Sequence, residues 1–308
     1  KVTIATGGIL YGSAVGGASS ITGGSILPGL GRELVVFANG KTLTVSNGSY
    51  AGLFTGAGSL VKASGGTLVF TGVNADDYQG STTVDAGTLT FTQAVTLAGQ
   101  VTNNATLNFT NAGNTALTTG LAGTGATNFS GDTSVGTLDG TNTASVSIAG
   151  GKVLTVDSGS FAGSLTGGGS LVKSTGGSLT LSGAGAGNYV GTTTVDAGTL
   201  DFIQVVTLLG QVTNNSTLNF GGAGTTTLTG GLTGSGTTTF SGNGSITSRS
   251  GTGVVNFLGN VSISTVTGSG DLNIASGKSL TIQQGVYAGS ITGSGDLVKT
   301  TGGELELI

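Results

Sequence analysis

The sequence predicts an all-β fold, a parallel β-solenoid with rungs of about 20 residues and essentially no α-helix. Three observations support this prediction. Glycine supplies 63 of the 308 residues and proline only one. The apolar residues form short runs separated by Gly, Ser, Asn and Asp, and one long segment returns twice along the chain. Together these features indicate many short strands that stack in a repeating order.

The composition excludes the other glycine-rich classes. Collagen needs a Gly-X-Y period and abundant proline, and neither is present. A mean hydropathy of +0.31 argues against a disordered Gly/Ser linker. A long helix is excluded as well, because each interior glycine costs about 1 kcal/mol relative to alanine. The remaining apolar residues are mainly Leu, Val, Ile and Phe, which are compatible with strands.

A long internal repeat organises the chain. The segment at 40–70 returns at 151–181 and at 277–307, and the lysine of its GxLVK motif marks the phase of each copy. These lysines, at positions 62, 173 and 299, set a first period of 111 and a second of 126, so the second unit is longer by 15. We place the extra residues in the stretch 241–276, around Arg249 and the apolar run Val254 to Leu258.

These periods predict one continuous β-solenoid over residues 1–308. Its internal units are a partial unit at 1–39, full units at 40–150 and 151–276, and a partial unit at 277–308. The chain has no initiator Met and no signal peptide, so we expect a processed or excised product.

A smaller motif, Thr-Leu-x-Phe/Val, recurs inside each unit and defines the rungs. It begins at positions 42, 67, 88 and 106. One such rung cannot bury its apolar face alone, whereas stacked rungs can. Strand alternation predicts that Thr and Asn point outward and that the inward positions are Leu43, Val45, Leu68, Phe70, Val84, Leu89, Phe91, Leu107 and Phe109.

The two segments GSLVKASGGTLVFTGVNADDYQGSTTVDAGTL (58–89) and GSLVKSTGGSLTLSGAGAGNYVGTTTVDAGTL (169–200) carry a family resemblance. Their order of motifs resembles the passenger-associated, or autotransporter-associated, β-strand repeat, and the truncated third copy shares part of it. The resemblance implies a type V secretion passenger of a Gram-negative bacterium, folded as a parallel right-handed β-helix. It implies a secreted, extracellular protein at the outer membrane that acts in adhesion, aggregation or display.

The residues offer little for catalysis, and we predict no enzyme, no cofactor and no metal site. The chain contains no His and no Cys, which removes the common nucleophile systems and the usual zinc ligands. The adjacent pair Asp76 and Asp77 is interpreted as part of a solvated turn. The GSGDL segments at 268–272 and 293–297 are interpreted as turns, because calcium-binding repeats need tandem spacing.

Two further groups of side chains are assigned structural roles. We expect the phase-marking lysines to be solvated at strand edges. We expect five aromatic residues, each two positions before a glycine, to pack at corners, with sugar stacking as the alternative if they are exposed. The lysines are Lys62, Lys173 and Lys299, and the aromatic residues are Tyr50, Tyr78, Phe161, Tyr189 and Tyr287.

The charge and hydropathy of the chain limit the classes of binding partner that we expect. A net charge of −4 without a basic stripe argues against nucleic acid. No apolar run approaches the roughly 20 residues that span a bilayer, so we expect no membrane insertion of this segment. The expected partners are another copy of the chain, or glycans or proteins of host or bacterial surfaces.

Three functions from different classes follow. One is a structural and adhesive rod. Another is a polysaccharide-active β-helix enzyme, which the shortage of paired carboxylates disfavours. The remaining one is a filament or coat subunit that stacks head to tail, since an open strand at the end of a solenoid can pair with a strand of another copy. The end-to-end residues are Lys1, Val2, Thr3, Ile4, Glu304, Leu305, Glu306, Leu307 and Ile308.

Overall fold

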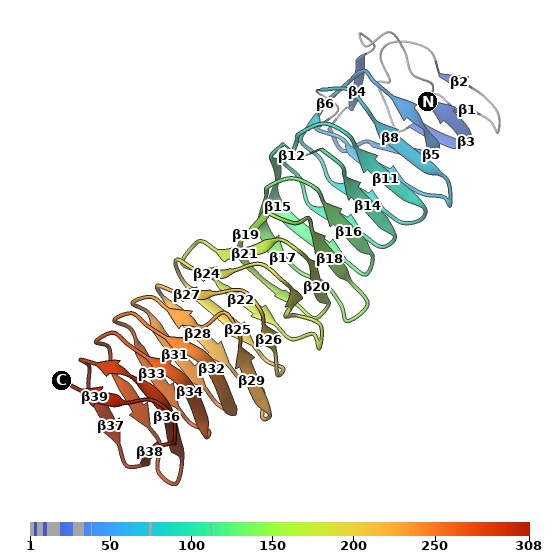
Figure 1. Ribbon diagram of the computed structural model, residues 1–308. Helices are drawn as coiled ribbons and strands as arrows, with labels where there is room; N and C mark the ends of the chain where they lie inside the picture. Colours follow the sequence, from blue (N-terminus) through green and yellow to red (C-terminus); the bar gives the residue numbers. More distant parts are fainter. Residues whose placement is uncertain are drawn as a thin grey trace. The chain divides into compact units, whose positions relative to one another are not determined.

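The computed structural model describes residues 3–4, 9–10, 19–26, 34–37, 39–73, 76–111 and 113–308. It is an all-β, parallel β-solenoid of about 14 turns with about 19 residues in each turn, and the described residues form no helix. The fold class expected from the sequence is therefore confirmed. The chain forms two compact units, Lys1–Leu154 and Thr155–Ile308. Figure 1 shows the successive strands of each unit stacked turn upon turn.

In chain order, the first strands are β1 Thr3–Ile4, β2 Ile9–Leu10, β3 Ser19–Ile26, β4 Leu34–Phe37, β5 Thr42–Tyr50, β6 Leu53–Gly56, β7 Ser59–Lys62, β8 Thr67–Phe70, β9 Asp77–Tyr78, β10 Thr82–Val84, β11 Thr88–Phe91, β12 Val95–Leu97, β13 Val101–Asn103, β14 Thr106–Phe109, β15 Thr115–Gly123, β16 Ala126–Phe129, β17 Thr133–Leu138 and β18 Ser145–Ile148. They are followed by β19 Val153–Phe161, β20 Ser164–Gly167, β21 Ser170–Lys173, β22 Ser178–Leu181, β23 Asn188–Tyr189, β24 Thr193–Val195, β25 Thr199–Phe202, β26 Thr207–Leu208, β27 Val212–Asn214, β28 Thr217–Phe220, β29 Thr225–Leu228 and β30 Leu232–Thr233. The last strands are β31 Thr237–Phe240, β32 Asn243–Arg249, β33 Val254–Phe257, β34 Val261–Val266, β35 Leu272–Ile274, β36 Ser279–Tyr287, β37 Ile291–Gly293, β38 Asp296–Lys299 and β39 Leu305–Leu307.

Parallel pairing in register places like residues on like residues. In the first unit β8, β11, β14 and β16 align so that their four terminal phenylalanines form one column. The ring centroids of successive members lie 5.2, 5.5 and 5.2 Å apart. Burial of each ring is worth about 2 kcal/mol, and stacking adds to it. The column consists of Phe70, Phe91, Phe109 and Phe129.

The second unit repeats this column on β25, β28, β31 and β33. Its ring centroids lie 5.5, 4.9 and 6.1 Å apart. The residues are Phe202, Phe220, Phe240 and Phe257.

The predicted inward positions are all buried, with relative exposures of 0 to 3%. The prediction that Thr and Asn point outward is wrong at several positions. Thr82, Thr127 and Asn103 in the first unit are buried, as are Thr193 and Asn214 in the second. They are tolerated there because their polar atoms have hydrogen-bond partners inside the solenoid.

The extra residues of the second unit form one additional turn. In the first unit Phe129 pairs directly with Ile148 of the following turn. In the second unit Phe240 pairs with Phe257, and Phe257 pairs with Ile274, so two turns stand where the first unit has one. The location predicted from the sequence is therefore correct. The insertion is a regular part of the stack and pairs with the turns before and after it.

Glycine is required where one corner rests on the corner of the preceding turn. Gly87 has a φ of 72°, and a Cβ there would lie 2.3 Å from the carbonyl oxygen of Gly66. Gly198, its counterpart in the second unit, has a φ of 71° and would bring a Cβ within 2.2 Å of the Gly177 oxygen. Both the left-handed backbone and the close approach exclude a side chain.

Candidate functional site

Two of the three lysines of the repeat, Lys62 and Lys173, are buried, which corrects the expectation of solvated side chains for them, whereas Lys299 is exposed as expected. Lys62 and Lys173 are both fully buried, with 0% exposure. Each lies on the inward side of its strand, in register with a valine of the next turn. The stem fills apolar space, and the ammonium reaches the carbonyls at the corner. Burial lowers the pKa of both amines from the ordinary lysine value.

Each buried ammonium holds two turns together. Lys62 Nζ donates to the Ser64 oxygen of its own turn and, at 2.9 Å, to the Ala86 oxygen of the next turn. Lys173 Nζ donates in the same way to the Thr175 oxygen and, at 3.2 Å, to the Ala197 oxygen. The lysine of the repeat is therefore a clamp between turns.

Buried tyrosines support the same repeats. The hydroxyls of Tyr78 and Thr82 lie 2.6 Å apart, and those of Tyr189 and Thr193 are separated by the same distance. Burial raises the pKa of both phenols well above the ordinary value. The five aromatic residues expected to pack at corners are all buried, so the packing interpretation is confirmed and sugar stacking on them is excluded.

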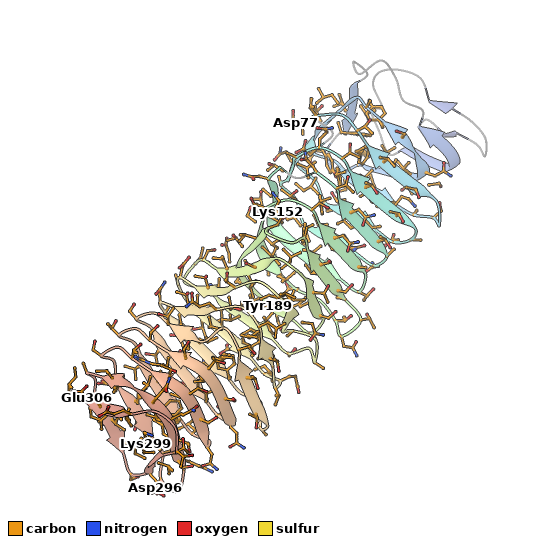
Figure 2. All side chains as sticks on the ribbon, viewed as in Figure 1. Asp77, Lys152, Tyr189, Asp296, Lys299 and Glu306 are labelled. Carbon is orange, nitrogen blue, oxygen red and sulfur yellow. The ribbon has the colours of Figure 1, made fainter. Side chains whose placement is uncertain are left out.

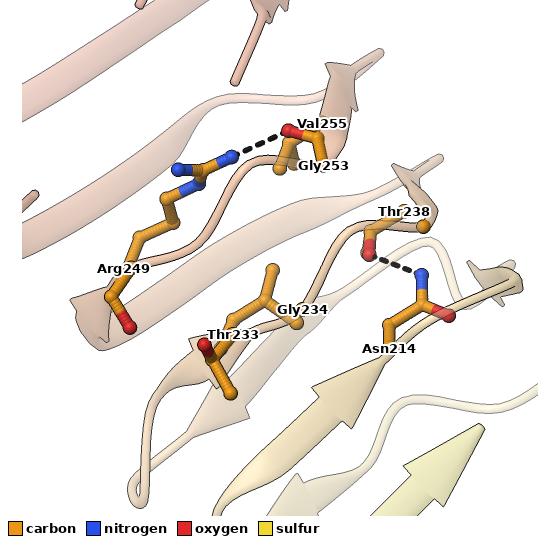
Figure 3. Close-up of a pocket in the computed structure, with 10 residues that line it drawn as sticks. Asn214, Thr233, Gly234, Thr238, Arg249, Gly253 and Val255 are labelled. Atoms are coloured by element: carbon orange, nitrogen blue, oxygen red, sulfur yellow. Dashed lines mark hydrogen bonds between the residues drawn. The ribbon is translucent and has the colours of Figure 1, made fainter. Parts of the chain in front are cut away.

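A buried asparagine in each unit completes the internal polar network. Asn103 Nδ2 donates to the Ala126 oxygen and to Thr127 Oγ1 of the next turn at 2.8 and 2.9 Å. Asn214 makes the equivalent bonds to Thr237 and Thr238. Figure 3 shows the Asn214–Thr238 bond.

Arg249 is the internal cation of the inserted turn, and its exposure is only 2%. Its guanidinium donates to the carbonyls of Gly251, at 2.7 Å, and of Gly253 (Figure 3). It also lies 5.7 Å from the centre of the Tyr287 ring, in a cation–π contact. Burial lowers the pKa of Arg249, although Tyr287 opposes this shift.

The cavity beside Arg249 measures about 10 Å³. This is roughly the space that one water molecule needs. Its walls include Asn214, Thr233, Gly234, Thr238 and Gly253 (Figure 3). Such a site has room for solvent and not for a substrate.

The acidic residues are dispersed. Asp76 is partly buried and accepts a hydrogen bond from the Thr96 amide of the next turn, while Asp77 is exposed at the start of β9. Burial raises the pKa of Asp76, and the neighbouring Asp77 adds to this shift. Among the described residues no three acidic side chains are grouped in a way that could hold a metal ion. The Asp76 carboxylate thus pins one turn to the next.

The residues expected to stack end to end lie in or beside strands wherever they are described. Thr3 and Ile4 form β1, whereas Lys1 and Val2 lie outside the described residues. At the other end β39 pairs with β36, and Ile308 donates its amide to the Tyr287 oxygen at 3.0 Å. Figure 2 labels Glu306 in this last strand. Stacking through Glu304, Leu305, Glu306, Leu307 and Ile308 stays a prediction.

Sequence reasoning missed the buried cations, although one signal was available. Leu60 and Lys62 are two positions apart in β7, so strict alternation already places the lysine inward. Arg249 carries no such signal, because Thr247 and Ser248 are both exposed and interrupt the alternation of β32.

A lysine variant tests the clamp. We expect Lys173→Met to lower the free energy of unfolding by about 2 kcal/mol, because the Thr175 and Ala197 oxygens lose a buried donor. Urea denaturation followed by circular dichroism measures this change. Lys299, the exposed third lysine, is the matched control, and Lys299→Met should shift stability by less than about 0.5 kcal/mol. Equal effects of the two substitutions would contradict the clamp.

A tyrosine variant tests the buried phenols. An unfolded tyrosine ionises near pH 10, whereas Tyr189 keeps its proton in the folded state to a higher pH. Above about pH 10 the folded state therefore binds more protons than the unfolded state, and stability falls as the pH rises. We expect Tyr189→Phe to cost about 1 kcal/mol at pH 7, where Thr193 loses its partner, and to weaken this alkaline loss. Urea midpoints at pH 7 and above pH 10 provide the measurement. If the variant loses stability above pH 10 as steeply as the wild type does, Tyr189 is not the group responsible for this loss.

The described residues form no helix that could cross a membrane. Comparison with curated proteins and with solved structures finds no match. A scan against family models matches residues 60–91 and 171–202 to the passenger-associated-transport-repeat. These segments make up about a fifth of the chain and include both lysine clamps and the buried tyrosines Tyr78 and Tyr189. The chain thus carries two passenger-associated-transport repeats, and these repeats and the β-solenoid fit an autotransporter passenger.

Proposed function

We propose that the chain is an extracellular, structural and adhesive β-solenoid at the surface of a Gram-negative bacterium. The observation that carries this proposal is the pair of passenger-associated-transport repeats set in a parallel solenoid. In this role the solenoid spaces and displays its outer faces, and binding takes place on those faces.

Export is compatible with the way the turns are held together. In a solenoid each turn contacts mainly the turn before and the turn after it, so a chain that emerges gradually can fold turn by turn. The clamps of Lys62 and Lys173 join one turn to the next and need no distant segment. The chain contains no cysteine, so its folding does not depend on disulfide formation.

A non-enzymatic role is supported by where the reactive groups lie. The buried cations and phenols are occupied by backbone carbonyls and hydroxyls of the solenoid itself. The outer strand positions carry mainly Thr, Ser and Asn, which suit many weak contacts better than bond cleavage. Adhesion through repeated polar faces therefore agrees better with this chemistry than polysaccharide cleavage does.

Surface labelling of intact cells tests the proposal. Antibodies against the chain should label unpermeabilised cells of the bacterium that encodes it, and external protease should remove the label. Deletion of the coding region should reduce cell aggregation or attachment to surfaces. Label that appears only after permeabilisation, with unchanged attachment, would refute the proposed role.

A further inference from the structure

One outer face of the second unit is hollowed over four successive turns. The hollow has a volume of about 260 Å³ and lies on β29, β32, β34 and β36. Two columns of side chains line it. One is a hydroxyl column of Ser245, Ser262 and Thr281, which Thr227 continues on the turn before. The other column has two asparagines at its centre and consists of Thr225, Asn243, Asn260 and Ser279. We call this surface the polar groove.

The asparagines of the polar groove are held in fixed orientations. Asn243 Oδ1 accepts the Asn260 amide of the next turn at 3.0 Å, and Asn260 Oδ1 accepts the Ser279 amide at 3.0 Å. Because each oxygen is engaged by the backbone, each Nδ2 group is left as a donor in a defined direction. Within the described part of the chain neither Nδ2 group has a hydrogen-bond partner, and both side chains are exposed. The groove thus offers ordered donors without a ligand of its own.

The inserted turn extends this surface. Two strands of the groove, β32 with Ser245 and β34 with Ser262, stand where the described part of the first unit has the single strand β17, because two turns there take the place of one. The first unit also has different residues at the positions that match by the period of 111. Asp132 corresponds there to Asn243, and Ala116 corresponds to Thr227. The Asp132 carboxylate can only accept hydrogen bonds, and it accepts the Val153 amide at 3.0 Å.

An apolar rim lies on the turn before the groove. Val205, Thr207 and Leu209 alternate outward there, and Thr207 is in register with Thr227 of the hydroxyl column. Val205 and Leu209 are 41% and 48% exposed. Their counterparts in the first unit are Ala94 and Ala98, so this rim belongs to the second unit alone.

Charge is confined to the far end. Ser279 is in register with Asp296 of the next turn, and Asp296 is exposed, as Figure 2 shows. No residue that lines the groove carries a charge. Lys278, which directly precedes Ser279, supplies the opposite charge at this end, so the neutral lining gives no net attraction for an acidic ligand or a phosphate backbone.

We propose that the polar groove binds a linear, neutral oligosaccharide. This deepens the proposed function, on which it rests, by naming the ligand class of one adhesive face. Sugar hydroxyls both donate and accept, as the groove lining does, and the C–H face of a pyranose ring suits the apolar rim. Adjacent turns are about 4.8 Å apart, a distance comparable to one sugar in an extended chain. Four turns therefore accommodate about three sugars.

Titration of the purified chain with trisaccharides tests the groove. The probes are cellotriose, laminaritriose, mannotriose and triacetylchitotriose, with trigalacturonate as the acidic counterpart, and isothermal titration calorimetry measures binding. We expect saturable binding of at least one neutral trisaccharide and at least about tenfold weaker binding of trigalacturonate. The double variant Asn243→Asp, Asn260→Asp should weaken the neutral ligand at least about tenfold, because each change removes a donor and adds a charge.

The matched control lies on another strand of the same turns. Asn256 and Asn273 also form a ladder, with 3.4 Å between Nδ2 of Asn273 and Oδ1 of Asn256, but they do not line the groove. Asn256→Asp, Asn273→Asp should leave the neutral ligand bound as in the wild type. Circular dichroism establishes that both double variants fold.

Three results would overturn the groove proposal: no binding of any neutral trisaccharide, equal binding of trigalacturonate, or equal loss in the two double variants. None of them changes surface labelling of intact cells. Failure of the groove is therefore distinguishable from failure of the proposed function.

Discussion

Parallel stacking in register is the constraint on which the whole molecule depends. Each residue lies on its counterpart one turn away, so the side chains of a column must be able to pack on one another at every turn. Phenylalanine does so by stacking, with successive ring centroids 4.9 to 6.1 Å apart in the columns that begin at Phe70 and Phe202. Corners do so by glycine, since a Cβ at Gly87 would meet the backbone of the preceding turn. A buried cation must find carbonyls within its own or the adjacent turn, as Lys62 does.

The same constraint leaves the outer faces free to differ. The two full repeats keep their internal groups, including the lysine, the tyrosine and the asparagine, at identical spacing. Outside, Ala94 and Asp132 of the first unit become Val205 and Asn243 of the second. The inserted turn is made compatible with the stack by Arg249, whose guanidinium satisfies corner carbonyls. A scaffold of this kind can diversify its surface without disturbing its core.

Much of this fold is readable from the sequence because repetition and alternation are both visible in it. The repeat of Thr-Leu-x-Phe locates the core columns, and the change of period from 111 to 126 locates the inserted turn. The burial of Lys62 was not predicted, because the usual exposure of charged side chains was given more weight than the alternation of inward and outward residues along the strand. Arg249 was not readable, since the exposed pair before it breaks the period of two. The polar groove could not be foreseen either, because it depends on the register between strands that belong to successive turns.

Disulfide trapping tests the central claim, that the extra residues of the second unit form a turn of the stack. The chain has no cysteine, so any disulfide within it must form between the two introduced residues. Thr239 is in register with Asn256, and Asn256 with Asn273, at separations that a disulfide can bridge. We predict that the pair Thr239→Cys, Asn256→Cys oxidises readily and that Thr239→Cys, Asn273→Cys does not, as read by mass spectrometry. If the extra residues were a loop, Thr239 would lie beside Asn273, and efficient oxidation of that second pair would contradict the account.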